Sequence, residues 1–179
     1  MRLLTAVLIG LLIMTAFGCS HKVTIIKTNR PEEKLELRTI PPGEKARQSD
    51  IFLAKAKKFY LKGKYKQTLS FCEKAIKFNH DNWEAHYYMG LAMQRKRLYA
   101  QSIEALKIGL KLGPESRFFK SEMHCNLAIN YEKMGMAERA RSEYQLALTL
   151  DSANQNARKG LNRIKVNKTM KNWKKEKRH

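Results

Sequence analysis

Cysteine and histidine are the side chains of this sequence that could carry metal binding or nucleophilic catalysis. Away from the start of the chain the candidates are Cys72, Cys125, His86 and His124. A metal site needs several ligands at set distances, and no further ligands recur with suitable spacing. His124 and Cys125 are adjacent, so on a helix they cannot both point at one substrate, as a thiol–imidazole pair must. A Gly-rich phosphate loop and a nucleophile elbow are also missing from the sequence. We therefore expect no metal, no cofactor and no enzyme activity, and small buried roles for both cysteines.

The stretch from Trp83 to Pro114 predicts two short amphipathic helices joined by a tight basic turn. With Trp83 as position 1 of a repeat, small residues fall at positions 8, 20 and 27. The same register begins at Ser49 and again at Ser121. Small residues are needed where two antiparallel helices approach closely, and large residues fill the gaps beside them. In the three units the small residues are Ala56, Thr68 and Ala75; Gly90, Ser102 and Gly109; and Ala128, Ala140 and Ala147.

This spacing resembles the tetratricopeptide repeat (TPR) family. The resemblance implies an all-α, right-handed superhelix of three helix-turn-helix units, 49–82, 83–116 and 121–154. Position 15 holds Gly63 and Gly135 in the outer units but Arg97 in the second unit, which is expected to loosen that turn.

A stack of repeats needs a terminal cap, and the segment 155–179 is predicted to supply a capping helix followed by a basic tail. Ser152 or Asn154 can cap this helix at its N-terminus. Apolar residues recur within it at helical spacing, at Ala157, Leu161 and Ile164.

In TPR proteins the concave surface is lined mostly by the first helix of each unit. Carried onto this sequence, the resemblance predicts a partner-binding groove with an apolar floor and charged rims, which suits a helical or extended peptide. The carboxylate clamp of the chaperone adaptors of this family is absent, because Leu53, Tyr87 and Cys125 occupy key places. An alternative is that the groove is filled by the chain's own tether or tail. The predicted groove residues are Leu53, Lys57, Tyr60, Tyr87, Leu91, Gln94, Arg95, Ile129, Glu132 and Lys133.

The start of the chain has the pattern of an export signal. Met1-Arg2 is followed by an apolar run from Leu3 to Phe17, which is short for a membrane span. The sequence Thr15-Ala16-Phe17-Gly18-Cys19 resembles the lipobox of bacterial lipoproteins, which implies a signal peptide at 1–18 and lipidation of Cys19. Simple secretion after Gly18 and an uncleaved anchor are the alternatives. Ser20 implies sorting to the outer membrane, facing the periplasm, and 19–48 is expected to be an extended tether.

The chain is strongly basic, with 36 Lys and Arg against 16 Asp and Glu and a net charge of +20. Such a charge fits nucleic acid, an anionic surface or an acidic partner, and the export signal argues against nucleic acid. Val166, Met170 and Trp173 fall on one helical stripe surrounded by lysines. This segment is expected to contact a membrane or an acidic partner, or else to be a solvated helix extension. The contact candidates are Lys165, Lys168, Met170, Lys171, Trp173 and Lys174.

The TPR units and the export signal together resemble bacterial TPR lipoproteins, and distantly the pilotin-type factors that bind secretin subunits of type IV pili. The resemblance implies a non-catalytic, envelope-anchored scaffold that binds a peptide segment of a protein partner during assembly of an envelope complex. The alternative is a structural protein whose basic tail binds anionic lipid, lipopolysaccharide or peptidoglycan.

Overall fold

The computed structural model describes residues 40–177, and within this range all regular structure is α-helical. The predicted signal peptide, Cys19 and most of the predicted tether lie outside the described residues. The described helices are α3 (Pro42–Leu61), α4 (Tyr65–Phe78), α5 (Trp83–Arg95), α6 (Tyr99–Lys111), α7 (Arg117–Lys133), α8 (Ala137–Leu150) and α9 (Gln155–Glu176). No helix in this range is both long enough and apolar enough to cross a membrane.

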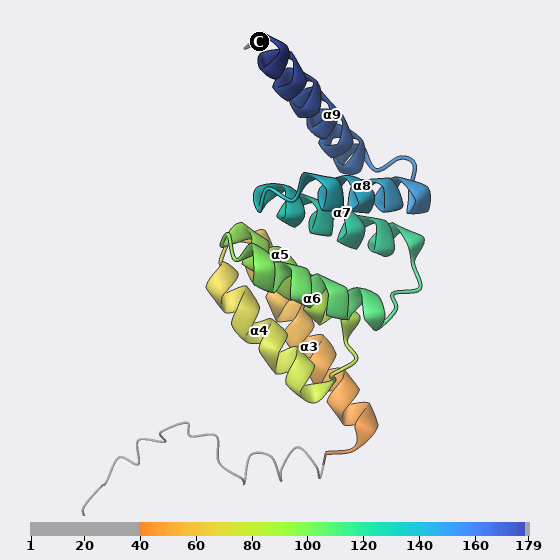
Figure 1. Cartoon of the computed structure of the whole chain (residues 1–179). Helices are drawn as coiled ribbons and strands as arrows, with labels where there is room; N and C mark the ends of the chain where they lie inside the picture. Colours follow the sequence, from red (N-terminus) through yellow and green to blue (C-terminus); the bar gives the residue numbers. More distant parts are fainter. Residues whose placement is uncertain (1–39, 178–179) are drawn as a thin grey trace, which may run out of the picture. The chain divides into compact units, whose positions relative to one another are not determined.

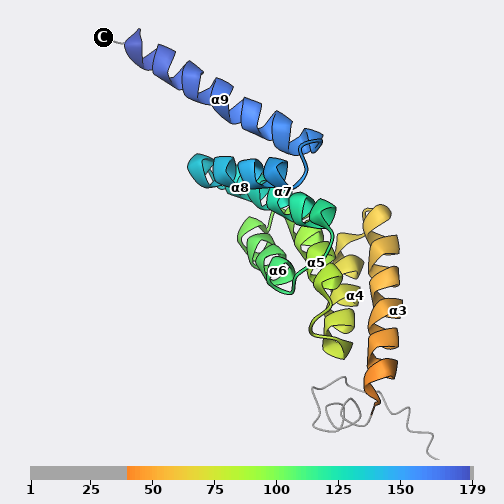
Figure 2. The same ribbon diagram turned by 90° about the vertical axis from the view of Figure 1, so that its right-hand side faces the viewer.

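The helices form three antiparallel pairs, α3–α4, α5–α6 and α7–α8, which stack in the order of the sequence (Figure 1). Each pair corresponds to one predicted unit, and α9 packs against α8 and α7 as the predicted cap. Figure 2 shows the helices of the first two units beside one another, in the order α6, α5, α4 and α3 from left to right. The all-α TPR superhelix expected from the repeat spacing is therefore the fold of the described chain.

Small residues sit where the paired helices approach most closely, as the register predicts. All nine residues at positions 8, 20 and 27 are buried. Gly90 is the tightest of the close approaches between α5 and α6, because a Cβ atom there would lie 2.7 Å from Leu106 Cγ. The spacing of the small residues in the sequence therefore predicts where the two helices of each unit contact each other.

The main core runs through the second and third units to the cap. Leu106, Met123 and Tyr144 are fully buried in it, and Ala157 and Ile164 of α9 complete it. Asn154, one of the two predicted caps, accepts a hydrogen bond on its Oδ1 from the backbone N–H of Ala157 at 3.0 Å. Asn82 caps α5 in the same way through Ala85.

Two helices begin earlier than the sequence predicted. The predicted tether extends to residue 48, but α3 begins at Pro42, because proline is well suited to the first turn of a helix. The third unit was predicted from Ser121, but α7 begins at Arg117. This additional turn is stabilised by Phe119, whose ring lies 5.0 Å from that of Trp83.

The turns within the three units share one backbone conformation. Position 15 has φ values of 70° at Gly63, 63° at Arg97 and 77° at Gly135. Arg97 therefore adopts the same left-handed conformation as the two glycines, and the turn is kept rather than loosened. This conformation is unfavourable for a residue with a Cβ atom by about 1–2 kcal/mol.

We expect Arg97→Gly to raise the free energy of unfolding by about 0.5–1 kcal/mol, because relief of backbone strain exceeds the entropy that glycine adds to the unfolded chain. Urea denaturation followed by circular dichroism would measure it. Gly135→Ala is the mirror control, since no atom lies within 4 Å of the added Cβ and only the backbone conformation is tested. A loss of stability in Arg97→Gly would contradict the strain argument.

Candidate functional site

The first helices of the units, α3, α5 and α7, bring the predicted groove residues onto one set of neighbouring helices. Lys57 on α3 forms an ion pair with Glu84 on α5. Arg95 on α5 donates from Nε to the hydroxyl of Tyr60 on α3, at 3.5 Å, and this bond raises the pKa of Arg95. The polar residues at the groove positions thus link successive units.

Three of the predicted floor residues are more deeply buried than an open groove requires. Leu53, Tyr87 and Leu91 are 6%, 8% and 8% exposed and belong to the core clusters. They pack between successive first helices, so they support the surface from beneath. Ile129 is half-buried against the same core, and Lys133 is exposed.

An aromatic ladder crosses the same helices; it contains the predicted groove residues Tyr60 and Tyr87, and three further rings that the sequence did not indicate. The ring of Tyr60 lies 5.7 Å from Tyr88, and Tyr88 lies 5.5 Å from Tyr87. Tyr87 lies 6.2 Å from Phe119, which lies 5.5 Å from Phe118. Phe118 is 56% exposed, and Tyr60, Tyr88 and Phe119 are half-buried. The ladder therefore offers apolar ring surface across three helices.

The groove positions of the third unit are engaged by the cap. Arg163 of α9 binds Glu132 through two hydrogen bonds of 2.6 and 2.7 Å, and Tyr144 donates its hydroxyl proton to the same carboxylate at 2.9 Å. Hydrogen bonding to Arg163 lowers the pKa of Glu132. Glu132 is therefore occupied by the capping helix, whereas the alternative that the apolar groove residues are covered by the tether or the tail stays a prediction.

The second and third units are also joined through Gln94, which was predicted to line the groove. Its Nε2 donates to the backbone oxygen of Asn126 at 3.2 Å and to Oδ1 of Asn130 at 3.0 Å. Asn130 in turn donates to Ser102. Gln94 is therefore held in place by a chain of hydrogen bonds that ends in the buried pairing of α5 and α6.

The cysteines have the buried positions that the sequence predicted. Cys72 and Cys125 are 0% and 1% exposed and unpaired, and burial raises the pKa of both thiols to about 12. A thiol in this state is neither a nucleophile nor a metal ligand at neutral pH. In the part of the chain that the structure describes, no cluster of three His, Cys, Asp or Glu residues could hold a metal ion.

We expect Cys72 and Cys125 to resist thiol reagents in the native protein at neutral pH, because each is buried as the thiol. Absorbance assays with an aromatic disulfide reagent on a Cys19→Ser variant would count the reactive thiols. Both cysteines should react once the protein is unfolded in denaturant. Fast labelling of either one in the native protein would show that the helix packing around it opens readily.

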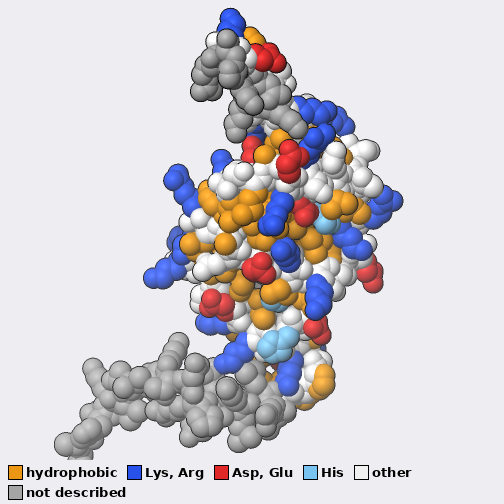
Figure 3. Space-filling view, in the orientation of Figure 1, with side chains coloured by type: hydrophobic (Ala, Val, Ile, Leu, Met, Phe, Trp, Pro, Cys, Tyr) orange, Lys and Arg blue, Asp and Glu red, His pale blue; other side chains and the backbone are white. Residues whose placement is uncertain are grey.

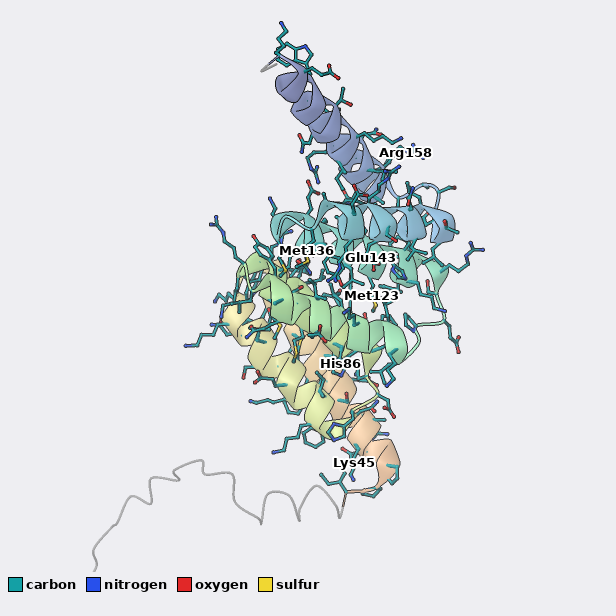
Figure 4. All side chains as sticks on the ribbon, in the orientation of Figure 1. Lys45, His86, Met123, Met136, Glu143 and Arg158 are labelled. Carbon is teal, nitrogen blue, oxygen red and sulfur yellow. The ribbon has the colours of Figure 1, made fainter. Side chains whose placement is uncertain are left out.

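The two candidate histidines lie on different helices, α5 and α7, and have different surroundings. Figure 4 labels His86 and also Glu143, the partner of His124. His124 pairs with Glu143 of α8, with 2.7 Å between Nδ1 and Oε2. His86 is 9% exposed, its Nδ1 has no hydrogen-bond partner, and burial lowers its pKa. His86 therefore remains neutral at pH 7.

A second concavity lies between the second helices of the first two units and was not predicted from the sequence. We call it the α4–α6 groove; it has a volume of about 560 Å³ and a floor formed by α5. The sequence signal was the stripe His86, Met89 and Met93, which lies on the face of α5 away from the concave positions. The residues that line it are Glu73, Ile76, Lys77, His80, His86, Met89, Met93, Gln101, Glu104, Ala105 and Ile108.

The apolar stripe on the tail is solvent-exposed. Val166, Met170 and Trp173 are 60%, 51% and 50% exposed, and Lys165 is exposed as well. The side chains of the other contact candidates, Lys168, Lys171 and Lys174, lie outside the described residues. The helical stripe predicted from the sequence is therefore present and unpacked, while its role in binding stays a prediction.

Comparison with known proteins identifies the fold. The TPR domain of Arabidopsis OM64 matches with a TM-score of 0.64 at 15% identity, over 69% of this chain and 98% of that one. The second TPR domain of human RPAP3, solved with the HSP70 peptide SGPTIEEVD, has a TM-score of 0.60 at 17% identity, over 70% of this chain and 98% of that one. The Yersinia enterocolitica type III secretion translocator chaperone SycD has a TM-score of 0.61 at 17% identity, over 68% of this chain and 95% of that one.

No protein-family model matches the chain, and no curated protein matches its sequence. The structural likeness to TPR domains, at these low identities, establishes the fold and leaves the partner to be argued from the residues of this chain.

Proposed function

We propose that the protein is a scaffold that binds a peptide segment of a protein partner on the surface of α3, α5 and α7, without catalysis. The aromatic ladder carries this proposal, because rings lying across three helices suit the side chains of an extended or helical peptide. TPR domains of the same fold have been solved with peptides, as with human RPAP3.

The charges beside the ladder favour a peptide with acidic residues. Lys57, Arg95 and Lys133 all border this surface, and Lys57 and Glu84 already form one ion pair across it. Arg95 and Lys133 are exposed and can reach a ligand. A peptide with two apolar anchors separated by carboxylates would satisfy both the rings and the cations.

Charge reversal on the exposed rim tests the proposal without disturbing the core. We expect the double variant Arg95→Glu and Lys133→Glu to lose the partner captured by crosslinking and pull-down from the native cells. Tyr87→Ala or Leu91→Ala would test packing instead, since both side chains are buried. Lys107→Glu is a matched control, because it makes the same change at an exposed site on α6. Unchanged capture by the double variant would contradict the assigned surface.

We further propose that Cys19 is lipidated and holds the domain at the outer membrane facing the periplasm, where its partner belongs to an envelope complex such as a pilus or secretin assembly. Support comes from the residues before Cys19 and from Ser20 after it. Incorporation of a labelled fatty acid into the full chain, lost on Cys19→Ser, is the expected result. A soluble, unlabelled wild-type chain would contradict the anchor and leave the peptide-binding surface untouched.

A further inference from the structure

The α4–α6 groove is an apolar concavity on the side of the molecule away from the aromatic ladder. Its floor is His86, Met89 and Met93 of α5, and Ile108 on its wall is 44% exposed. Figure 3 shows hydrophobic side chains together with a histidine on the face that α4 and α6 present. Methionine side chains adapt their shape to an occupant, so this floor suits an inserted apolar side chain.

The rim of the groove differs in charge from the rest of the chain. Glu73 and Glu104 flank it, with Lys77 as the cation among its lining residues. Glu104 also forms an ion pair with Lys107, at 3.7 Å on the exposed side of α6. The chain as a whole carries 36 basic and 16 acidic residues. A basic partner segment would therefore meet carboxylates at this site, whereas most other parts of the surface would repel it.

Helix α9 contains a segment with matching properties. Its first half packs on α7 and α8, and its second half extends beyond them (Figure 1). Val166, Met170 and Trp173 form one exposed stripe there, and the sequence from 165 to 177 has six lysines and one glutamate. Exposed aromatic and aliphatic side chains in a row are typical of a protein-binding surface.

The stripe and the floor also match in length. Val166 and Trp173 are separated by seven positions along the helix, and so are His86 and Met93, which corresponds to about 10 Å of helix axis in each case. Within the described chain α9 contacts α7 and α8, whereas the groove is built from α4, α5 and α6. A separate molecule can bring the stripe and the groove together without any change in this packing.

We propose that the α4–α6 groove binds the C-terminal half of α9 from a second copy of this chain, with Trp173, Met170 and Val166 seated over Met89 and Met93 and the lysines beside Glu73 and Glu104. Reciprocal docking closes a two-fold dimer, and one-way docking extends the assembly head to tail.

Site-directed crosslinking between two differently tagged copies tests the docking directly. One copy carries Thr169→Cys, an exposed position of α9 that leaves the three stripe residues in place, and the other carries Ile108→Cys. Both are made in the full chain with Cys19→Ser; native Cys72 and Cys125 are buried and do not interfere. We expect a disulfide-linked heterodimer that diminishes at high salt. Ile51, which is 41% exposed on α3, gives the matched control, and Ile51→Cys should not crosslink to Thr169→Cys. Equal crosslinking to both positions would overturn the proposal.

Sedimentation of the full chain provides the second measurement. We expect self-association that depends on concentration and weakens at least about tenfold in Trp173→Ala, a truncation of an exposed anchor that leaves the fold intact. Glu73→Lys with Glu104→Lys should weaken it as well. A chain that stays monomeric at all concentrations would overturn the proposal. If that monomer instead binds vesicles of anionic phospholipid through Trp173, the stripe is a membrane contact.

Discussion

Tyr144→Ala is expected to lower the free energy of unfolding by about 3–5 kcal/mol, the usual cost of removing a large buried ring. Tyr144 is fully buried between α8 and α9. A Cβ atom at Gly160 would lie 2.1 Å from Tyr144 Cζ, so the ring fills the whole space between the two helices. Its removal leaves a cavity where the cap meets the third unit. Urea denaturation followed by circular dichroism is the measurement.

Two further variants distinguish the contribution of the aromatic ring to stability from that of its hydroxyl group. Tyr144→Phe removes the hydrogen bond that the hydroxyl donates to Glu132 and the longer one, 3.4 Å, that it accepts from Arg163. Glu132 and Arg163 keep their bonds to each other, so a loss of about 1 kcal/mol is expected. Gly160→Ala should destabilise the wild-type chain, because the methyl group meets the ring. In the Tyr144→Ala background the same change should be neutral or favourable, since the ring is gone. An equal cost in both backgrounds would contradict the described packing.

The fold could be predicted from the sequence because its determinants are local. Gly90 and Ser102 are small because α5 and α6 touch there, and the same requirement recurs in each unit at the same spacing. That requirement is visible in one unit and is confirmed by repetition in the others. The early start of α7 could not be predicted in this way, because Phe119 is stabilised by Trp83 of the preceding unit.

The candidate surface was predicted in part. The TPR register placed Lys57, Tyr60, Gln94 and Arg95 on the first helices, where the structure has them. It could not tell that Leu53, Tyr87 and Leu91 are buried, because burial depends on how closely successive units approach each other. The α4–α6 groove was missed for the same reason, since it is bounded by helices of two different units.

Asn154→Ala is the second large effect that we expect, with a loss of about 2–4 kcal/mol in the free energy of unfolding. Asn154 caps α9 through Ala157, and its Nδ2 donates to Ser121 Oγ and to Glu122 Oε1, both at 3.0 Å. Ser121 in turn donates to the backbone oxygen of Ala147. One side chain therefore joins α7, α8 and α9.

The same repeat position in the other two units gives matched comparisons for Asn154. Asn82 makes the corresponding bonds to Ser49 and Ala85 but has no carboxylate partner, so Asn82→Ala should cost less, about 2–3 kcal/mol. Ser116 is exposed and makes no capping bond with its side chain, so Ser116→Ala should change stability by less than about 0.5 kcal/mol.

The difference between the two asparagine variants should depend on pH. Burial raises the pKa of Glu122, whereas the bond from Asn154 lowers it, so without Asn154 the ionised carboxylate is buried with one donor fewer. The raised pKa means that protonation of Glu122 favours the folded state, and that contribution is lost as the pH rises through its pKa. Asn154→Ala should therefore be most damaging at neutral pH and approach Asn82→Ala in acid. Urea denaturation of both variants at neutral and acidic pH would measure the difference between their free energies of unfolding. If that difference does not change with pH, the loss in Asn154→Ala comes from the helix cap alone and not from Glu122.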